Sequence, residues 1–367
     1  MSVAGKRMKL VVFGLSVTSA WGNGHATLWR ALCKALGAAG HRVVFCEHDT
    51  PWYAGARDSL SIRGLTTLVY PDWNSLAPRA RAELRDADAA IVTSYCADGR
   101  EAAALVMEAA RPLRVFYDLD TPVTLARLAQ GEPPDYLPIE GLSGFDLVLS
   151  YTGGQALTLL RRELGARRVA PLYGSVDPEA HHPAEPVATY AADLSYLGTY
   201  AADRQPALEC LLVEPARRRP SSRFVIGGAQ YPHDFPWTAN IHFVRHMPPP
   251  EHPAFFSSAR LTLNVTRRDM AALGWCPSGR LFEAASCGTP VLSDCWDGLD
   301  SFYTPGEEIL LARSTDDALA ALDLDEAERL RIARRARERT LEEHTGARRA
   351  AELVAALEAV RAPVMEG

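Results

Sequence analysis

Short apolar runs alternate with segments of helical periodicity along almost the whole chain, and this alternation limits the possible folds most. In the first half the apolar runs cover residues 10–15, 43–46, 67–70, 89–93, 113–117 and 147–150. Amphipathic stretches such as 26–39 and 99–110 lie between them and often close with Gly or Pro. Strands joined by helices of this length form a parallel sheet covered on both faces. The pattern therefore predicts an α/β domain of Rossmann type.

The alternation breaks once, in a polar stretch from Tyr173 to Ala192. Pro178, Pro183 and Pro186 fall inside it and disfavour both a helix and a central strand. The alternation then restarts, with strands expected at 194–197, 224–227, 241–244, 261–265, 291–293 and 308–311, and helices at 205–217 and 250–258. We therefore expect two Rossmann-like domains, at 1–175 and 193–345, joined by a linker at 176–192 and followed by a C-terminal helix at 346–367.

Length and composition agree with two ordinary globular domains. The chain has 367 residues, which is longer than a chain that folds around a single hydrophobic core usually is. Its residues are 47% apolar and 23% charged. A net charge of −6 without a long basic stripe argues against a nucleic-acid partner, and no apolar run approaches the roughly 20 residues of a transmembrane segment. The seven cysteines are scattered, without a C-x-x-C pair, which favours a reducing, cytoplasmic location over a zinc site or disulfide framework.

Residues 277–294, PSGRLFEAASCGTPVLSD, carry the most specific functional signal. Glu283 is expected to open a short helix that ends at Gly288-Thr289-Pro290, before an apolar strand. Free amides at a helix N-terminus bind phosphate, and a carboxylate accepts hydrogen bonds from sugar hydroxyls. This segment therefore predicts a site for a nucleotide sugar.

Two Rossmann-like domains with Gly-Asn-Gly-His at 22–25 and this late glutamate helix resemble the GT-B glycosyltransferases. Within that fold the segment 277–294 resembles the CgeB-type branch, a relative of glycosyltransferase family 4. Further similar segments occur in the expected order: FYDLDTPVTLARL, DLVLSYTGG, PLYGSVDPE, YLGTYAADRQPALE and LTLNVTR. The resemblance covers nearly the whole chain and implies that the C-terminal helix crosses back to the first domain.

The resemblance implies transfer of a sugar from a nucleotide-diphosphate-sugar donor, bound mainly by the second domain, to an acceptor held by the first. The acceptor is an unknown small molecule, lipid or polymer. By position, Glu283 matches the glutamate that holds the donor ribose, and Gly288 and Thr289 match the turn after its helix. Gly198 and Thr199 match the glycine turn after the first strand of the second domain.

Three more polar residues are candidates for donor binding. Arg204 is a candidate for diphosphate contact, and Arg280 could bind phosphate in a bidentate manner or form an ion pair with Glu283 one turn later. Asn264, just after a strand, could line the donor pocket or form a turn.

One position departs from the family pattern. Family 4 enzymes usually carry a second glutamate, in contact with the donor sugar, eight residues before the ribose-binding one, and Trp275 stands there in this chain. The nucleotide half of the site is thus retained and the sugar half altered.

The chemistry is expected to require neither metal nor other cofactor. Charge on the leaving diphosphate can be stabilised by Arg204, Arg280 and helix-terminal amides. A metal site at Asp118-Leu119-Asp120 is the rival interpretation, because a D-x-D pair can hold a divalent cation with a nucleotide diphosphate. Its place at the end of the fifth apolar run argues against that role. The pair His181-His182 lacks metal-binding partners at a useful spacing and is assigned to the linker.

His25 and Asp120 are the catalytic candidates. Both follow strands of the first domain, where the ligands of open α/β sheets gather. A histidine oriented by an aspartate can activate an acceptor hydroxyl. Alternatively His25 caps its helix or donates to the backbone, and Asp120 caps the helix that begins at Thr121. The CgeB-type resemblance favours retaining chemistry, which needs no strong base.

Two other functions remain open. A sugar-nucleotide epimerase would share the fold and consume donor without an acceptor. A degenerate transferase would bind nucleotide as a scaffold, which Trp275 makes more plausible. The donor base and sugar, the stereochemical outcome and the oligomeric state are also open.

Overall fold

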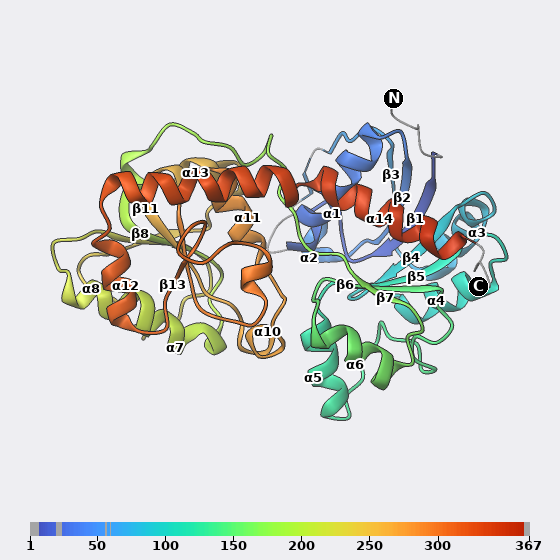
Figure 1. Ribbon diagram of the computed structural model, residues 1–367. Helices are drawn as coiled ribbons and strands as arrows, with labels where there is room; N and C mark the ends of the chain where they lie inside the picture. The colour runs from blue at the N-terminus through green and yellow to red at the C-terminus, as the bar shows by residue number, and fades with distance from the viewer. Residues whose placement is uncertain (1–6, 20–23, 56, 59, 363–367) are drawn as a thin grey trace. The chain divides into compact units, whose positions relative to one another are not determined.

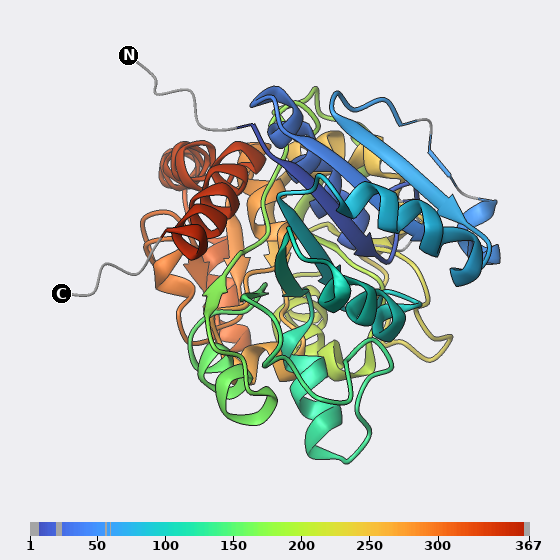
Figure 2. The same ribbon diagram turned by 90° about the vertical axis from the view of Figure 1, so that its right-hand side faces the viewer.

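The computed structural model describes residues 7–19, 24–55, 57–58 and 60–362. The chain divides into two compact units, one comprising residues 1–175 with 346–367 and the other residues 176–345. Each unit is an α/β domain built on one parallel sheet (Figures 1 and 2).

Unit 1 contains a seven-stranded parallel sheet in the order β3-β2-β1-β4-β5-β6-β7. Its strands are β1 (Lys9–Gly14), β2 (Arg42–His48), β3 (Leu65–Tyr70), β4 (Ala89–Thr93), β5 (Leu113–Asp118), β6 (Leu147–Ser150) and β7 (Val169–Pro171). Its helices are α1 (Gly24–Ala38), α2 (Pro51–Ala54), α3 (Trp73–Leu84), α4 (Gly99–Glu108), α5 (Thr121–Ala129), α6 (Gln155–Leu164) and α14 (Gly346–Arg361).

The central strands of unit 1 are buried along their whole length, as expected for a sheet with helices on both faces. Alternate residues of β1 enter two different hydrophobic clusters. Val11 and Phe13 belong to one cluster, and Leu10 and Val12 belong to the other. The strand order reverses beside β1, and the carboxyl ends of β1, β4 and β5 gather polar residues there.

Helix α14 completes the core of unit 1. Its residues Leu353 and Leu357 are fully buried in the cluster that contains Trp29 and Leu36 of α1. At its first residue a Cβ on Gly346 would stand 2.7 Å from the carbonyl oxygen of Ala31, so the two helices approach closely there. Figure 1 shows α14, in red, against the blue α1. The C-terminal helix thus returns to the first unit.

Unit 2 contains a six-stranded parallel sheet in the order β10-β9-β8-β11-β12-β13. Its strands are β8 (Ala192–Leu197), β9 (Phe224–Gly228), β10 (Ile241–Arg245), β11 (Ala259–Asn264), β12 (Val291–Ser293) and β13 (Leu310–Leu311). Its helices are α7 (Gln205–Leu208), α8 (Glu214–Arg218), α9 (His252–Ser257), α10 (Arg268–Leu273), α11 (Gly279–Ser286), α12 (Thr315–Leu322) and α13 (Glu326–Glu343).

The alternation of the sequence predicted almost every strand. Strand β7, only three residues long and ending in Pro171, was missed. The helix expected at 205–217 is α7 and α8 joined by a π-helical segment, Glu209–Val213. Residues 176–191 carry no strand and are counted with unit 2. No helix within the described part of the chain combines the length and apolar character needed to cross a membrane.

Candidate functional site

Helix α11 begins one turn earlier than the sequence suggested, so Glu283 lies in its middle instead of at its start. Ser278 is the N-cap residue, and its side chain accepts a hydrogen bond from the Arg280 amide. Gly288 ends the helix with φ of +77°, a conformation that favours glycine. The connection from β11 through α10 and α11 to β12 places the start of α11 on the carboxyl side of the sheet.

Glu283 forms an ion pair with Arg280 within α11. Glu283 is only 7% exposed. Burial raises the pKa of its carboxyl, but the charge of Arg280 and the neighbouring imidazoles outweigh burial and lower the pKa to about 2. Glu283 is therefore ionised at neutral pH, and its oxygens act only as hydrogen-bond acceptors. Arg280 is half-buried and lines a small hollow with Leu197 and Asn264.

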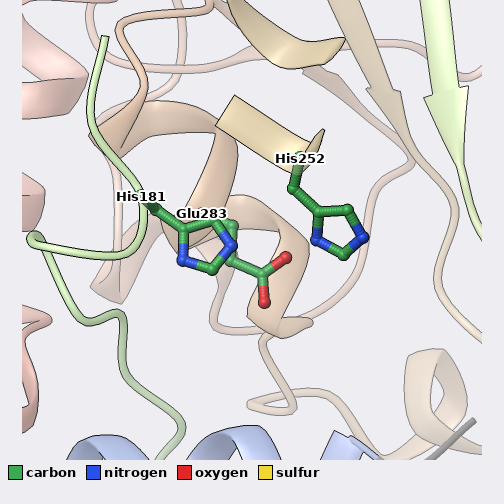
Figure 3. Close-up of side chains that lie close together, drawn as sticks. All are labelled: His181, His252 and Glu283. Atoms are coloured by element: carbon green, nitrogen blue, oxygen red, sulfur yellow. The ribbon is translucent and has the colours of Figure 1, made fainter. Parts of the chain in front are cut away.

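Two histidines flank this carboxylate, and one of them corrects the sequence analysis. His181 was assigned to the linker without metal-binding partners, whereas the fold brings it beside His252 of α9 and Glu283 (Figure 3). The rings of His181 and His252 lie 6.0 Å apart. Ser286 of α11 fixes the loop by donating a 2.6 Å hydrogen bond to the His181 carbonyl. The three partners are far apart in sequence, so spacing could not reveal them.

Gly198 lies directly after β8 and close to the end of β9. The Gly198 amide donates to the Gly227 carbonyl at 2.9 Å, and a Cβ on Gly228 would stand 2.0 Å from the Gly198 carbonyl oxygen. Arg204 follows Gly198 along the chain and donates to the Thr199 carbonyl at 3.4 Å. Gly198, Thr199 and Arg204 thus lie together at the carboxyl end of β8.

Asn264 and Thr289 are both buried in unit 2. The Asn264 side-chain amide donates to Ser293 Oγ at 3.0 Å. Thr289 Oγ1 donates to the Phe256 carbonyl at 2.7 Å, which holds the turn after α11 against the end of α9. Asp294 binds the Thr266 amide and hydroxyl, both at 3.0 Å, and joins the ends of β11 and β12.

Trp275, in the loop between α10 and α11, has an unusual backbone. Its φ is +42°, which is rare for a bulky residue. Its amide donates to the Asp297 carbonyl at 2.6 Å, and a Cβ on Gly298 would stand 2.3 Å from its ring. The indole therefore packs directly on the Gly298 backbone, which fixes the strained loop before α11.

The structure brings His25 and Asp120 of unit 1 into contact. His25 Nε2 lies 2.9 Å from Asp120 Oδ2, and both side chains are about four-fifths buried. Asp120 makes no side-chain capping bond to α5. Because a carboxylate only accepts, the hydrogen lies on Nε2, and the other nitrogen, Nδ1, is buried. Gly22 and Asn23, which precede His25, lie outside the described residues.

Asp118 is fully buried at the end of β5. One of its oxygens accepts from the Asp120 amide at 3.1 Å. Burial raises the pKa of its carboxyl to about 6. Asp118 and Asp120 thus differ in environment: one lies in the core and the other faces His25.

A second histidine–aspartate pair was missed by the sequence analysis. His48 ends β2, and its Nδ1 lies 2.9 Å from Asp98 Oδ2, which also accepts 2.7 Å from the Tyr70 hydroxyl at the end of β3. The hydrogen therefore lies on Nδ1, and Nε2 remains an acceptor on a side chain that is 28% exposed. His25 was selected because polar residues near the carboxyl ends of strands are candidate site residues. The same criterion could have identified His48.

Glu47, beside His48, was also missed and has a structural role. It is fully buried and accepts from Ser16 Oγ at 2.9 Å and from the Val17 and Thr18 amides at 2.7 and 3.0 Å. These bonds fix the loop that follows β1.

Comparison with known proteins supports a glycosyltransferase-type architecture. A model of the family "Glycosyl transferase-like" matches residues 204–355, which include Arg204, Arg280 and Glu283. A search of curated protein sequences gives no significant match.

Solved structures match over nearly the whole chain. A sucrose-phosphate synthase from Thermosynechococcus elongatus is similar with a TM-score of 0.70 and 16% identity, over 97% of this chain and 99% of that one. HepE of Anabaena in complex with UDP-glucose is similar with a TM-score of 0.66 and 12% identity, over 96% and 100%. AviGT4, a glycosyltransferase involved in avilamycin A biosynthesis, gives 0.60 and 15%, over 96% and 98%. The chain has the two-domain GT-B fold of glycosyltransferases.

Proposed function

We propose that this protein is a glycosyltransferase that moves a hexosyl group from a nucleotide-diphosphate-sugar donor to an acceptor, and that it belongs to the CgeB-type branch related to family 4. The observation that carries the proposal is the buried, ionised Glu283 paired with Arg280 on α11, on the carboxyl side of a parallel sheet. A nucleotide diphosphate offers ribose hydroxyls and a negatively charged diphosphate. At this edge of the sheet a carboxylate can accept hydrogen bonds from the hydroxyls, and a guanidinium can bind the diphosphate.

On the donor side, Glu283 would accept from the ribose hydroxyls. Arg204, Arg280 and the amides at the start of α11 would bind the diphosphate, while Gly198 and Thr199 would let the chain approach it closely. Asn264, Gly288 and Thr289 shape this region from within unit 2. The complex of HepE with UDP-glucose makes UDP the first nucleotide to test.

On the acceptor side, the two histidine–aspartate pairs of unit 1 are candidates for binding and activating a hydroxyl. His25 with Asp120 was expected from sequence, but the acceptor nitrogen of His25 is buried. His48 with Asp98 keeps its acceptor nitrogen on a partly exposed side chain, which favours His48 as the base.

We propose that transfer proceeds without a metal ion. Arg204 and Arg280 are fixed cations that can offset the charge that develops on the leaving diphosphate. A cytoplasmic location is part of the same proposal.

The decisive experiment is a thermal-shift screen of nucleoside diphosphates and their sugars in chelator-treated buffer, followed by donor consumption with a panel of acceptors. A ligand that binds only the native state raises the melting temperature by mass action. We expect one nucleoside diphosphate to stabilise the protein and its sugar to be consumed only when an acceptor is present.

Other outcomes separate the alternatives. Donor turnover without an acceptor would identify an epimerase. Nucleotide binding without turnover on any acceptor would identify a scaffold, the second candidate, which the replacement at Trp275 favours. Absence of nucleotide binding would refute the proposal itself.

A further inference from the structure

Three side chains from distant parts of unit 2 converge in its interior. His181 lies on the segment before β8, His252 begins α9, and Glu283 lies on α11. Each offers one ligand atom, and these atoms all lie within 4.8 Å of one another. The three residues are 6–7% exposed. Figure 3 shows the Glu283 carboxylate lying toward both imidazole rings.

His181 differs from the other two residues in its hydrogen bonding. Both of its ring nitrogens are buried, and neither has a hydrogen-bond partner among the described residues. A buried polar group without a partner destabilises the folded state, so native proteins rarely keep one without a reason. A cation that accepts the lone pair of the unprotonated imidazole nitrogen would satisfy one of these two atoms.

We propose that His181, His252 and Glu283 form a binding site for a divalent transition-metal cation, with Zn²⁺ the best match. Two imidazole nitrogens and one carboxylate oxygen are a common zinc ligand set and leave the fourth tetrahedral position for water or another ligand. Bonds of about 2.0–2.2 Å place tetrahedral ligand atoms about 3.5 Å apart, so the side chains must close by about 1 Å.

Arg280 does not block this arrangement. It donates to Oε2 of Glu283, which leaves Oε1 for the cation. The Arg280 side chain is 37% exposed, so its guanidinium can move toward solvent when a second positive charge enters.

The site has a consequence that rests on the proposed function. Glu283 is also the residue proposed to hold the donor ribose, so the cation and the donor would compete for one carboxylate. Zn²⁺ would then inhibit the enzyme instead of serving its chemistry.

Metal binding can be measured on the whole metal-free protein by calorimetry with Zn²⁺ and by visible absorption with Co²⁺. We expect one site per chain with a Kd below about 10 µM and a tetrahedral Co²⁺ spectrum without the near-ultraviolet band of thiolate ligands. His181→Leu and His252→Leu should each weaken binding by about 100-fold or more. His182→Ala, which changes the exposed neighbour of His181, is the control and should bind as the wild type does.

Two results would overturn the site: no binding tighter than about 100 µM in the wild type, or equal binding by wild type and both leucine variants when circular dichroism shows them folded. The competition is tested separately. Zn²⁺ should weaken UDP binding in the wild type and much less in His181→Leu, which keeps Glu283. UDP binding in metal-free buffer tests the proposed function, so either idea can fail while the other stands.

Discussion

Carboxylate side chains lie near the carboxyl ends of both sheets, but their ion-pair partners differ between the two units. In unit 1, Asp98 and Asp120 each contact a histidine. In unit 2, Glu283 forms an ion pair with Arg280 and also lies beside two imidazoles, and Asp203 pairs with Arg267. An imidazole can exchange a proton near neutral pH, whereas a guanidinium stays charged. This difference fits the two proposed roles, a hydroxyl activated in unit 1 and an anion held in unit 2.

The largest effect is expected on kcat when a histidine proposed to act as a general base in unit 1 is replaced. His48→Asn should lower kcat by about 100-fold with little change in donor KM, because general base catalysis typically contributes a factor of that size or more. His25→Asn should lower kcat by less than about 10-fold, because its acceptor nitrogen is buried. Steady-state kinetics with the donor found by the screen measures both.

The reverse order of these two effects would return the catalytic role to His25 and Asp120. If both variants retain wild-type rates, neither histidine is the catalytic base. Asp120→Asn provides a further check, because it should lower kcat by about the same factor as His25→Asn whichever histidine is the base.

Glu283→Gln should come next in size. The amide keeps the shape of the side chain but loses its charge, so the Kd for UDP should rise by about 30-fold to 100-fold, or roughly 2–3 kcal/mol. Isothermal calorimetry measures the change. Glu307→Gln is a matched control, because Glu307 also pairs with an arginine, Arg335, but on the exposed surface of the same unit. A Kd within about 3-fold of wild type for both variants would show that the nucleotide binds elsewhere.

Buried Asp118 should make the protein less stable at alkaline pH. Its pKa in the folded protein is about 6, above the ordinary 3.8, so the unfolded chain loses this proton first as pH rises. Folding stability should therefore fall between about pH 4 and pH 6 and stay reduced above that range. Asp118→Asn should restore about 1–3 kcal/mol at pH 8 and almost nothing at pH 4, measured by urea unfolding.

Asp294 of unit 2 is the control for this prediction. Burial raises its pKa too, but its carboxylate accepts from the Thr266 amide and hydroxyl. Asp294→Asn should gain less stability or lose some, because an amide group has one acceptor oxygen instead of two. An equal gain in both variants would show that hydrogen bonding does not distinguish the two sites.

The smallest effect is expected at Gly298, which lies against Trp275 in unit 2. Gly298→Ala should cost about 1–2 kcal/mol, because φ is +84° and the new methyl group would overlap the Trp275 ring. Gly306→Ala has nearly the same φ, +76°, with no atom within 4 Å of the new methyl group, and isolates the cost of backbone strain. Only Gly298→Ala should change the preference among donor sugars while UDP affinity remains unchanged.

Sequence periodicity was enough to predict both sheets, because buried parallel strands are uniformly apolar and the helices between them are amphipathic. It failed where an element lacks that signal. Strand β7 is short and ends in a proline, and its pairing with β6 depends on the rest of the sheet. The start of α11 was placed too late because Ser278, the actual N-cap, is followed by a glycine that does not suggest a helix.

Residues of the site were predictable when they lie at strand ends or in a local motif. The contact between His25 and Asp120 could be predicted because both follow strands of the same sheet, and their catalytic role stays a prediction. The group of His181, His252 and Glu283 was not predictable, because more than 70 residues separate the first two and only the fold brings them together. His48 was overlooked although its position at the end of β2 gave the same signal as His25.

Helix α14 has a consequence for how the protein is made. Residues 176–345 form all of unit 2, and only after them does the ribosome produce α14, which joins the hydrophobic cluster of Trp29 and Leu36 in unit 1. The part of that cluster that α14 covers must therefore stay uncovered during synthesis of the whole second unit, an interval of about 10–30 s at typical elongation rates. A nascent chain of this design is most exposed to aggregation or chaperone capture at its N-terminal domain, although that domain is translated first.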